Sequence, residues 1–242
     1  MAFRSSHIRA APGVEVLPPI GIGSRRRRAA NAALDVLALP LVAVLPRRAV
    51  TVGGCRVPLH YEFRRWTWRT ERCVEIALGG RALQSRRPED VLEVGNVLPL
   101  AGIAGHTVVD KYEEGPGVLN VDIIDFDPGR TYELVVSIST LEHVGWDEVP
   151  EEPDKAATAL EHIAQLGEKL LVTIPVGVHQ RLESAFLTGP FDDIAFLVKT
   201  GRLARWAQRP IEERSRVRYG APYAYGNGIL VGMRGRPFAS AQ

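Results

Sequence analysis

Two nearly continuous apolar runs constrain the fold of this chain more than any other feature. They are ELVVSI at 133–138 and KLLVTI at 169–174. A strand with one face in water alternates apolar and polar residues, whereas a strand buried on both faces is apolar along its whole length. A sheet that contains both runs must be covered by helices on each side. The sequence therefore predicts an α/β fold with a mostly parallel sheet.

Further short apolar segments alternate with polar connections, as expected for strands joined by crossovers. Strands are predicted at 90–94, 106–110, 119–124, 132–138 and 169–175. A helix is predicted at 154–166, DKAATALEHIAQL, because its apolar residues recur at helical spacing. Near the end of the chain we expect a helix with an adjoining strand or loop at 191–208, and a final strand at 228–235.

A hairpin and a helix are expected before this sheet. Residues 49–63, AVTVGGCRVPLHYEF, have two β-rich runs around the Gly-Gly pair at 53–54, which is typical of a tight hairpin. Apolar residues recur at helical spacing from 66 to 78, and the second Gly-Gly pair, at 79–80, is expected to end that helix.

The first part of the chain is rich in arginine. Residues 1–28 lack sustained periodicity, and we expect a flexible basic arm. The apolar run at 29–46 is shorter than the roughly 20 residues of a membrane span and contains Asp35 and Pro40, and it does not fit a secretory signal. Two alternatives stay open: a helix packed on the core, or an interfacial membrane anchor formed by residues 25–48.

Charge is distributed unevenly along the chain. Residues 1–88 contain 16 Arg and Lys against 5 Asp and Glu, whereas residues 89–242 contain 14 against 23. The basic part is expected to meet an anionic partner, which is a membrane surface, a phosphorylated substrate or the acidic part of the same chain. Nucleic acid is not expected, because basic and aromatic residues do not interleave along a stacking platform.

These patterns divide the chain into three parts. We expect a flexible basic arm at 1–28, a helical and hairpin segment at 29–88 that forms a lid or lies near a membrane, and a ligand-binding domain at 89–242. Cys55 and Cys73 are too few for a disulfide framework, and we expect two unpaired thiols in a reducing cytoplasm. The predicted location is therefore cytoplasmic, with peripheral contact to the inner face of the membrane if the anchor forms.

Polar residues and glycines follow the predicted strands where ligands bind in open α/β sheets. Glu93 and Asp110 end the first two strands and are 17 residues apart, close to the spacing of about 20 at which dinucleotide folds place an acid on a ribose diol. Gly95 allows a close backbone approach. The turn lacks the second and third glycines of a pyrophosphate-binding loop, which favours a cofactor without phosphates.

The segments VLEVGN, TVVDKYE, VLNVDIIDF, YELVVSISTLEHVGWDE and KLLVTIPVG occur in this order within residues 89–178. Their succession resembles the ordered motifs of class I S-adenosylmethionine-dependent methyltransferases. The resemblance implies a Rossmann-like fold, a mostly parallel seven-stranded sheet with helices on both faces, and S-adenosylmethionine as the cofactor. The basic arm, the hairpin and the first helix would be additions to that fold.

The resemblance also implies roles for single residues. The acid and glycine of the first motif, Glu93 and Gly95, would lie under the methionine part of the cofactor, where Asn96 replaces a usual small residue. Asp110 would bind both ribose hydroxyls. The remaining cofactor contacts would be Lys111 and Tyr112 beside the adenine, Asp122 accepting from the adenine amino group, Ile123 through its backbone, and Ser139 along the sulfonium.

The segment TLEHVGWDE at 140–148 follows the fourth strand of this series. A sulfonium already activates the methyl group, so the protein must align the acceptor and, for a hydroxyl, remove its proton. Histidine ordinarily titrates at about pH 6.5, and His143 is the predicted general base, with Glu142 orienting it. A contact with cofactor or substrate, and a capping or packing role, are the alternatives. Acceptor contacts are predicted for Trp146, Asp147 and His179.

The leading hypothesis is O-methylation of a small hydroxylated acceptor, a sugar or a secondary metabolite. A catalytically silent cofactor-binding or membrane-associated protein is the alternative, and a homo-oligomer stays open. No metal site is predicted, because the histidines lack ligand spacing. Glu71, Arg72 and Glu75 precede the ligand-binding domain, and we expect at least two of them on a solvated helix face.

Overall fold

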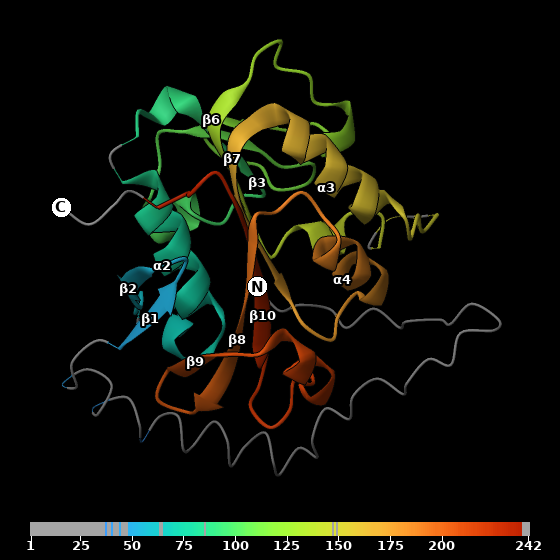
Figure 1. Ribbon diagram of the computed structural model, residues 1–242. Coiled ribbons are helices and arrows are strands. Elements are labelled where there is room, and N and C mark those ends of the chain that lie inside the picture. The colour runs from blue at the N-terminus through green and yellow to red at the C-terminus, as the bar shows by residue number, and fades with distance from the viewer. Residues whose placement is uncertain are drawn as a thin grey trace.

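A mixed eight-stranded sheet forms the centre of the computed structural model (Figure 1). Its strand order is β5-β4-β3-β6-β7-β10-β8-β9. The structure describes residues 37, 40, 44, 48–62, 65–84, 86–146, 148 and 150–238. The strands of this sheet are β3 (Val91–Val94), β4 (Thr107–Val109), β5 (Val118–Leu119), β6 (Tyr132–Ile138), β7 (Gly167–Pro175), β8 (Asp193–Gly201), β9 (Arg205–Arg209) and β10 (Gly228–Arg234).

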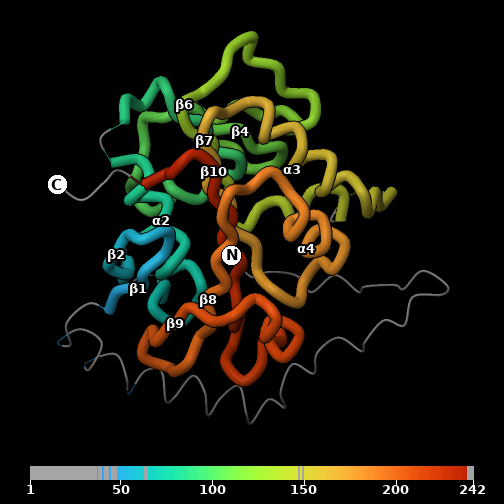
Figure 2. The backbone as a smooth tube through the Cα atoms, in the orientation of Figure 1, coloured from blue at the N-terminus to red at the C-terminus, as the bar shows by residue number. Residues whose placement is uncertain are grey.

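The first five strands of the sheet are parallel, and the chain reverses its direction of winding between β3 and β6. In a doubly wound sheet this reversal is the switch point beside which ligands bind. Strand β10 is antiparallel to both of its neighbours, β7 and β8, and Figure 2 shows it in the middle of the molecule. The Rossmann-like α/β fold is confirmed. Strand β9 pairs with β8 at one edge and makes the sheet one strand larger than the predicted seven.

Helices cover both faces of the sheet, as the apolar runs predict (Figure 1). Helix α2 (Arg72–Leu83) lies on one face together with the hairpin of β1 (Ala49–Val52) and β2 (Cys55–Pro58). Helices α3 (Lys155–Leu166) and α4 (Gln180–Leu187) lie on the other. Strand β6 contributes Leu134 and Val136 to the first apolar core and Val135 to the second, so both faces of this strand are buried.

Short 3₁₀ helices form most of the remaining connections. They are η1 (Thr67–Arg69), η2 (Pro88–Asp90), η3 (Pro99–Ala101), η4 (Ile123–Asp125), η5 (Leu141–His143) and η6 (Ile211–Arg216). The predicted hairpin, the helix at 154–166 and the strands near 91, 107, 132, 169 and 228 are confirmed. Both cysteines are unpaired, and burial raises the pKa of the Cys73 thiol to about 12.

The predicted end of the first helix at 79–80 is wrong, because α2 continues through both glycines to Leu83. A Cβ atom on Gly79 would lie 2.7 Å from Ile138 Cδ1 and 2.8 Å from Leu98 Cδ2. Glycine at this position therefore lets the helix pack closely on β6 and on the turn after β3. Close packing, and not helix termination, explains this pair of glycines.

Two strand predictions need correction. Residues 191–208 form the antiparallel strands β8 and β9 instead of a helix, because the run IAFLV at 194–198 is buried on both faces and such short runs fit either structure. The strand predicted at 119–124 is reduced to the two residues of β5. There the Asp122 side chain accepts from Ile124 N at 3.2 Å and begins η4, so the carboxylate competes with strand pairing.

The predictions for the basic arm at 1–28 lie outside the described residues, as do those for most of 25–48. Three single residues of the apolar run are described, and all three are helical and exposed: Leu37, Pro40 and Val44. In the part of the chain that the structure describes, no helix combines the length and the apolar character needed to cross a membrane.

Candidate functional site

The turns after β3 and β6 touch at the switch point. Gly95, directly after β3, has φ +93°, a conformation that favours glycine. A Cβ atom there would lie 2.0 Å from Thr140 Oγ1, and Thr140 belongs to the turn after β6. Gly95 N also donates to Val109 O of β4 at 2.8 Å. The glycine thus brings the ends of three neighbouring strands together.

Asp110 ends β4 and faces this turn. Its Oδ2 accepts from Asn96 N at 3.2 Å, and its Oδ1 accepts from Tyr112 N at 2.9 Å and Glu113 N at 2.7 Å. A carboxylate has about four acceptor positions, so roughly one stays open for a further donor. The structure therefore places Asp110 where a ligand between β3 and β4 would end, and its binding of ribose hydroxyls stays a prediction.

Glu93 points away from solvent and holds the β3 turn from inside. Its Oε1 accepts from Val97 N at 3.0 Å and Leu98 N at 2.8 Å, and its Oε2 lies 2.6 Å from His106 Nε2. The side chain is fully buried. These contacts give Glu93 a structural role beneath the predicted methionine site.

Asn96 is the residue of the turn with an unused polar atom. Its side chain is buried, and its Oδ1 has no hydrogen-bond partner. Leaving a buried amide oxygen unpaired costs about 1–3 kcal/mol, so a ligand that donated to this atom would gain a favourable contact. The predicted departure from a small residue at position 96 therefore adds an acceptor to the site.

Two lysines and two carboxylates form an ion-pair cluster at the next strand end. Lys111 Nζ lies 3.0 Å from both Asp122 Oδ2 and Glu148 Oε2, and Lys155 Nζ lies 2.7 Å and 2.6 Å from the same two oxygens. Burial alone would raise the pKa of Asp122, but hydrogen bonds from Lys155 and Lys111 outweigh it and lower the pKa to about 2. An adenine amino group would have to compete with these lysines for Asp122.

The other two predicted adenine contacts lie beside this cluster. Tyr112 is exposed, with Lys111 Nζ 5.2 Å from the centre of its ring, whereas the side chain of Ile123 is buried in the core. Glu148 and Lys155 could not be predicted from the sequence, because they follow Asp122 by 26 and 33 positions and no spacing pattern connects them to it.

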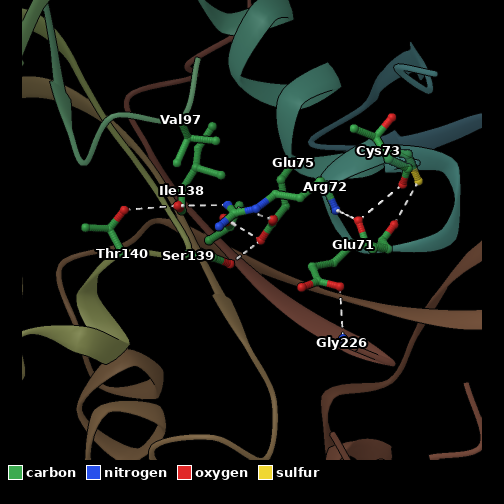
Figure 3. A network of polar contacts seen from close by, with 12 residues as sticks. Glu71, Arg72, Cys73, Glu75, Val97, Ile138, Ser139, Thr140 and Gly226 are labelled. Atoms are coloured by element: carbon green, nitrogen blue, oxygen red, sulfur yellow. Dashed lines mark hydrogen bonds and ion pairs between the residues drawn. The ribbon is translucent and has the colours of Figure 1, made fainter. Parts of the chain in front are cut away.

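The expectation of a solvated face at the start of α2 is wrong. Glu71 and Glu75 are both buried, one helical turn apart, on the side of α2 that faces the sheet (Figure 3). Glu75 Oε1 accepts from Ser139 Oγ and, at 3.1 Å, from Thr173 Oγ1, and its Oε2 accepts from Arg72 at 3.3 Å. Ser139, predicted to line the sulfonium, therefore joins α2 to the end of β6.

The predicted base and its partner occupy opposite environments. His143 has a side chain 59% exposed, and its Nε2 lies 3.9 Å from Glu142 Oε1. Glu142 is buried, its Oε2 has no hydrogen-bond partner, and burial raises its pKa to about 8. Residue 142 is therefore a neutral acid at pH 7, and the neighbouring imidazole lies at the surface.

This difference predicts a pH effect on stability. Between about pH 4.5 and 8 the folded protein keeps a proton on Glu142 that the unfolded chain releases, so the free energy of unfolding falls as pH rises through this window. The neutral variant Glu142→Gln is expected to melt several degrees higher than the wild type at pH 9 and at about the same temperature at pH 4. Thermal melting across this range measures the effect. Equal curves at every pH would contradict the burial of an ionisable group here.

The predicted acceptor residues Trp146 and His179 lie together, with ring centres 4.9 Å apart. His179 Nδ1 accepts from Leu182 N at 3.0 Å and caps α4. Burial lowers the pKa of His179, so the ring is neutral and carries its proton on Nε2, which has no partner. Asp147 lies outside the described residues. Within the described part of the chain, no three His, Cys, Asp or Glu side chains are grouped as metal ligands would be.

No protein-family model matches the sequence, and no curated protein matches it. Solved structures do match. The N-methyltransferase NodS from Bradyrhizobium japonicum WM9, in complex with S-adenosyl-L-homocysteine, has 12% identity and a TM-score of 0.43 over 67% of this chain and 85% of that chain. All the matches described here are methyltransferases by name.

Two further solved structures that match this chain name different methyl acceptors. The magnesium protoporphyrin IX methyltransferase ChlM from Synechocystis PCC 6803 has 16% identity and a TM-score of 0.38, over 68% of this chain and 79% of that chain. The sugar N-methyltransferase KedS8 from Streptoalloteichus sp ATCC 53650 has 16% identity and a TM-score of 0.34, over 76% of this chain and 98% of that chain.

Proposed function

We propose that the protein is an S-adenosylmethionine-dependent methyltransferase that methylates a hydroxyl group of a small acceptor, such as a sugar or a secondary metabolite. One observation carries the proposal. The switch point combines a glycine turn and a ribose-type acid, Gly95 and Asp110, but between Gly95 and His106, all of which the structure describes, the only helix is the three residues of η3. A pyrophosphate is normally held at the start of an α-helix in this place.

The polar atoms at the switch point fit a cofactor with a ribose and positively charged groups. Asp110 has an acceptor position for a ribose hydroxyl, and Asn96 Oδ1 is a buried acceptor without a donor. Lys111 and Tyr112 would flank the adenine. When bound, the cofactor would supply an activated methyl group. The protein's own residues would then only have to hold the acceptor in line with that group and take up a proton.

The exposed ring of His143 supports a hydroxyl acceptor. A hydroxyl must lose its proton during methyl transfer, and His143 lies in η5, which follows β6, with Glu142 beside it. The exposed Trp146 and the buried His179, whose rings lie together, would line the acceptor, with the His179 Nε2 proton available to an acceptor oxygen. An amine acceptor in its neutral form would need the base less, because its nitrogen attacks through a lone pair without first losing a proton.

Calorimetry with S-adenosylmethionine and S-adenosylhomocysteine tests the cofactor. The wild type is expected to bind both, and Asp110→Ala is expected to bind roughly 10- to 100-fold more weakly, the equivalent of a charged hydrogen bond of about 1.5–3 kcal/mol. Glu114→Ala is the matched control, because it removes the same charge from an exposed position in the same loop. Thermal melting checks that Asp110→Ala still folds.

Two results would contradict the proposal. A folded wild type that binds neither compound would remove the cofactor assignment, and equal affinities in Asp110→Ala and Glu114→Ala would remove the role of Asp110. Methyl transfer from labelled S-adenosylmethionine to a set of sugars then tests the acceptor class. In this methyl-transfer assay, His143→Asn is expected to lower turnover while leaving the affinity for the cofactor unchanged.

A further inference from the structure

Two buried carboxyl groups and one guanidinium lie together where α2 meets the end of β6 (Figure 3), and the charge of a third buried acid, Glu142, interacts with theirs. Glu71 directly precedes α2, Arg72 and Glu75 lie in its first turn, and Glu142 belongs to η5. These four residues are called the acidic cluster. The three acids, Glu71, Glu75 and Glu142, are 8%, 0% and 4% exposed. Fully ionised, three carboxylates and one guanidinium leave a buried charge of −2, which requires a proton or a further cation.

The hydrogen bonds of the acidic cluster leave one acid incomplete. Glu75 accepts from Ser139, Thr173 and Arg72. Glu71 Oε2 accepts from Gly226 N at 2.9 Å. Glu142 Oε2, by contrast, has no partner although it is buried. The unpaired oxygen marks Glu142 as the position where a donor or a cation is missing.

The charges around Glu142 explain why it is protonated when nothing is bound. Burial, followed by the charge of Glu75, raises its pKa, and the attraction of Arg72 does not compensate. The pKa of Glu71 is raised for the same reasons, and burial beside Glu71 and Glu142 raises the pKa of Tyr219 to about 12. His143 is the remaining titratable neighbour, with its Nε2 3.9 Å from Glu142 Oε1.

The acidic cluster borders the switch point directly. Ser139, which bonds to Glu75, is followed by Thr140, whose side chain is the one that a Cβ on Gly95 would strike. Arg72 NH1 also donates to Ile138 O, the last carbonyl of β6, at 3.2 Å. A ligand seated over Gly95 would therefore have the acidic cluster on its α2 side. The Arg72 side chain is one-third exposed, so the acidic cluster is not sealed.

We propose that the acidic cluster binds a positively charged sulfonium or ammonium group, and that Glu142 releases its proton when this cation binds. The proposal rests on the proposed function, since the cation is either the sulfonium of the cofactor or an ammonium group on the acceptor. In both cases the cation supplies the missing charge. Arg72 then balances one carboxylate and the ligand a second, so the acidic cluster keeps the net charge of −1 that it has with Glu142 protonated, and Glu142 Oε2 gains its partner.

The first arm of the test compares two cofactor forms that differ in this charge. S-adenosylmethionine has a cationic sulfur and S-adenosylhomocysteine a neutral one, and both have the same α-amino group, so its titration cancels in the ratio of their affinities. If the sulfonium is the cation, the ratio in the wild type is expected to rise by up to about tenfold per pH unit from pH 6 to 8, because one proton is released. In Glu142→Gln the ratio is expected not to change with pH.

The second arm tests an acceptor ammonium. Ethanolamine and ethylene glycol are small hydroxylated probes that differ in one charge, and each is titrated into the wild type with and without S-adenosylhomocysteine. If the acceptor supplies the cation, ethanolamine is expected to bind more tightly as pH rises towards 8, ethylene glycol is expected not to, and Glu142→Gln is expected to lose the difference. Glu114→Gln, at an exposed position, is the control in both arms.

Each outcome supports or contradicts the cation site, the proposed function or both. A pH-dependent affinity ratio, or pH-dependent ethanolamine binding, that Glu142→Gln removes supports the proposal and identifies the source of the cation. Cofactor binding with a constant ratio, together with no preference for ethanolamine, overturns it while leaving the proposed function intact. Failure of both cofactor forms to bind, with ethanolamine binding retained, contradicts the proposed function and supports the cation site by itself.

Discussion

Replacement of Gly95 by alanine is expected to lower the free energy of unfolding by about 2–5 kcal/mol. The added Cβ would lie 2.0 Å from Thr140 Oγ1, 2.8 Å from its Cγ2 and 2.9 Å from its Cβ, and the residue has φ +93°. A left-handed backbone costs a non-glycine residue roughly 1–2 kcal/mol, and overpacking adds about 1–3 kcal/mol. Urea denaturation measures the loss.

Gly102→Ala is the matched control for this prediction. Gly102 lies in the same connection with φ +81° but has no atom within 4 Å of the new Cβ. The control therefore carries the backbone strain without the clash. The double variant Gly95→Ala with Thr140→Gly removes the three atoms that the Cβ meets, and it is expected to regain most of the difference. Equal stabilities of the two alanine variants would show that the turns after β3 and β6 do not touch.

The second large effect is expected for Glu93→Ala, which should lower the free energy of unfolding by about 3–5 kcal/mol. The change leaves the backbone amides of Val97 and Leu98 and the ring of His106 without their acceptor inside the protein. Breaking a buried network from one side has this cost because the partners stay buried. Glu93→Gln keeps one oxygen for the two amides and is expected to lose clearly less. If alanine and glutamine variants unfold at the same urea concentration, the network does not stabilise the turn.

Cofactor binding by Glu93→Gln and Asp110→Ala separates an effect on the fold from an effect on function. Glu93 acts only on the turn in this structure, so Glu93→Gln is expected to weaken cofactor binding less than Asp110→Ala does. A stronger loss in Glu93→Gln would instead favour the direct contact with the methionine part that the resemblance implies.

The sequence predicts the strands of the parallel sheet well, for a physical reason. Residues 133–138 and 169–174 are nearly continuously apolar because both of their faces are covered, whereas a strand with one face in water alternates apolar and polar residues. Asp110 and Gly95 follow from the same logic, because strand ends fix where ligands bind. The prediction is weakest where a short apolar run fits two structures, as in β8.

The acidic cluster could not be predicted from the sequence, because burial is a property of the assembled fold. In the sequence, Glu71 and Glu75 look like part of a solvated helix face. The packing of α2 on β6 and β7 is what buries them. Thr173, a partner of Glu75, is 98 residues away along the chain. The neighbours Glu142 and His143 likewise differ in exposure because η5 turns one side chain inward and the next outward.

The position of β10 determines when the sheet can form. Residues Gly228–Arg234 pair with β7 on one side and β8 on the other, so a nascent chain has both neighbours before it has the strand that joins them. Until then β7 and β8 present unpaired edges, which are prone to wrong pairing. During synthesis the parallel half of the sheet can assemble early, but β8 and β9 have no place in it before Arg234 has left the ribosome. The eight-stranded sheet is therefore completed only after residues 228–234 have been synthesised.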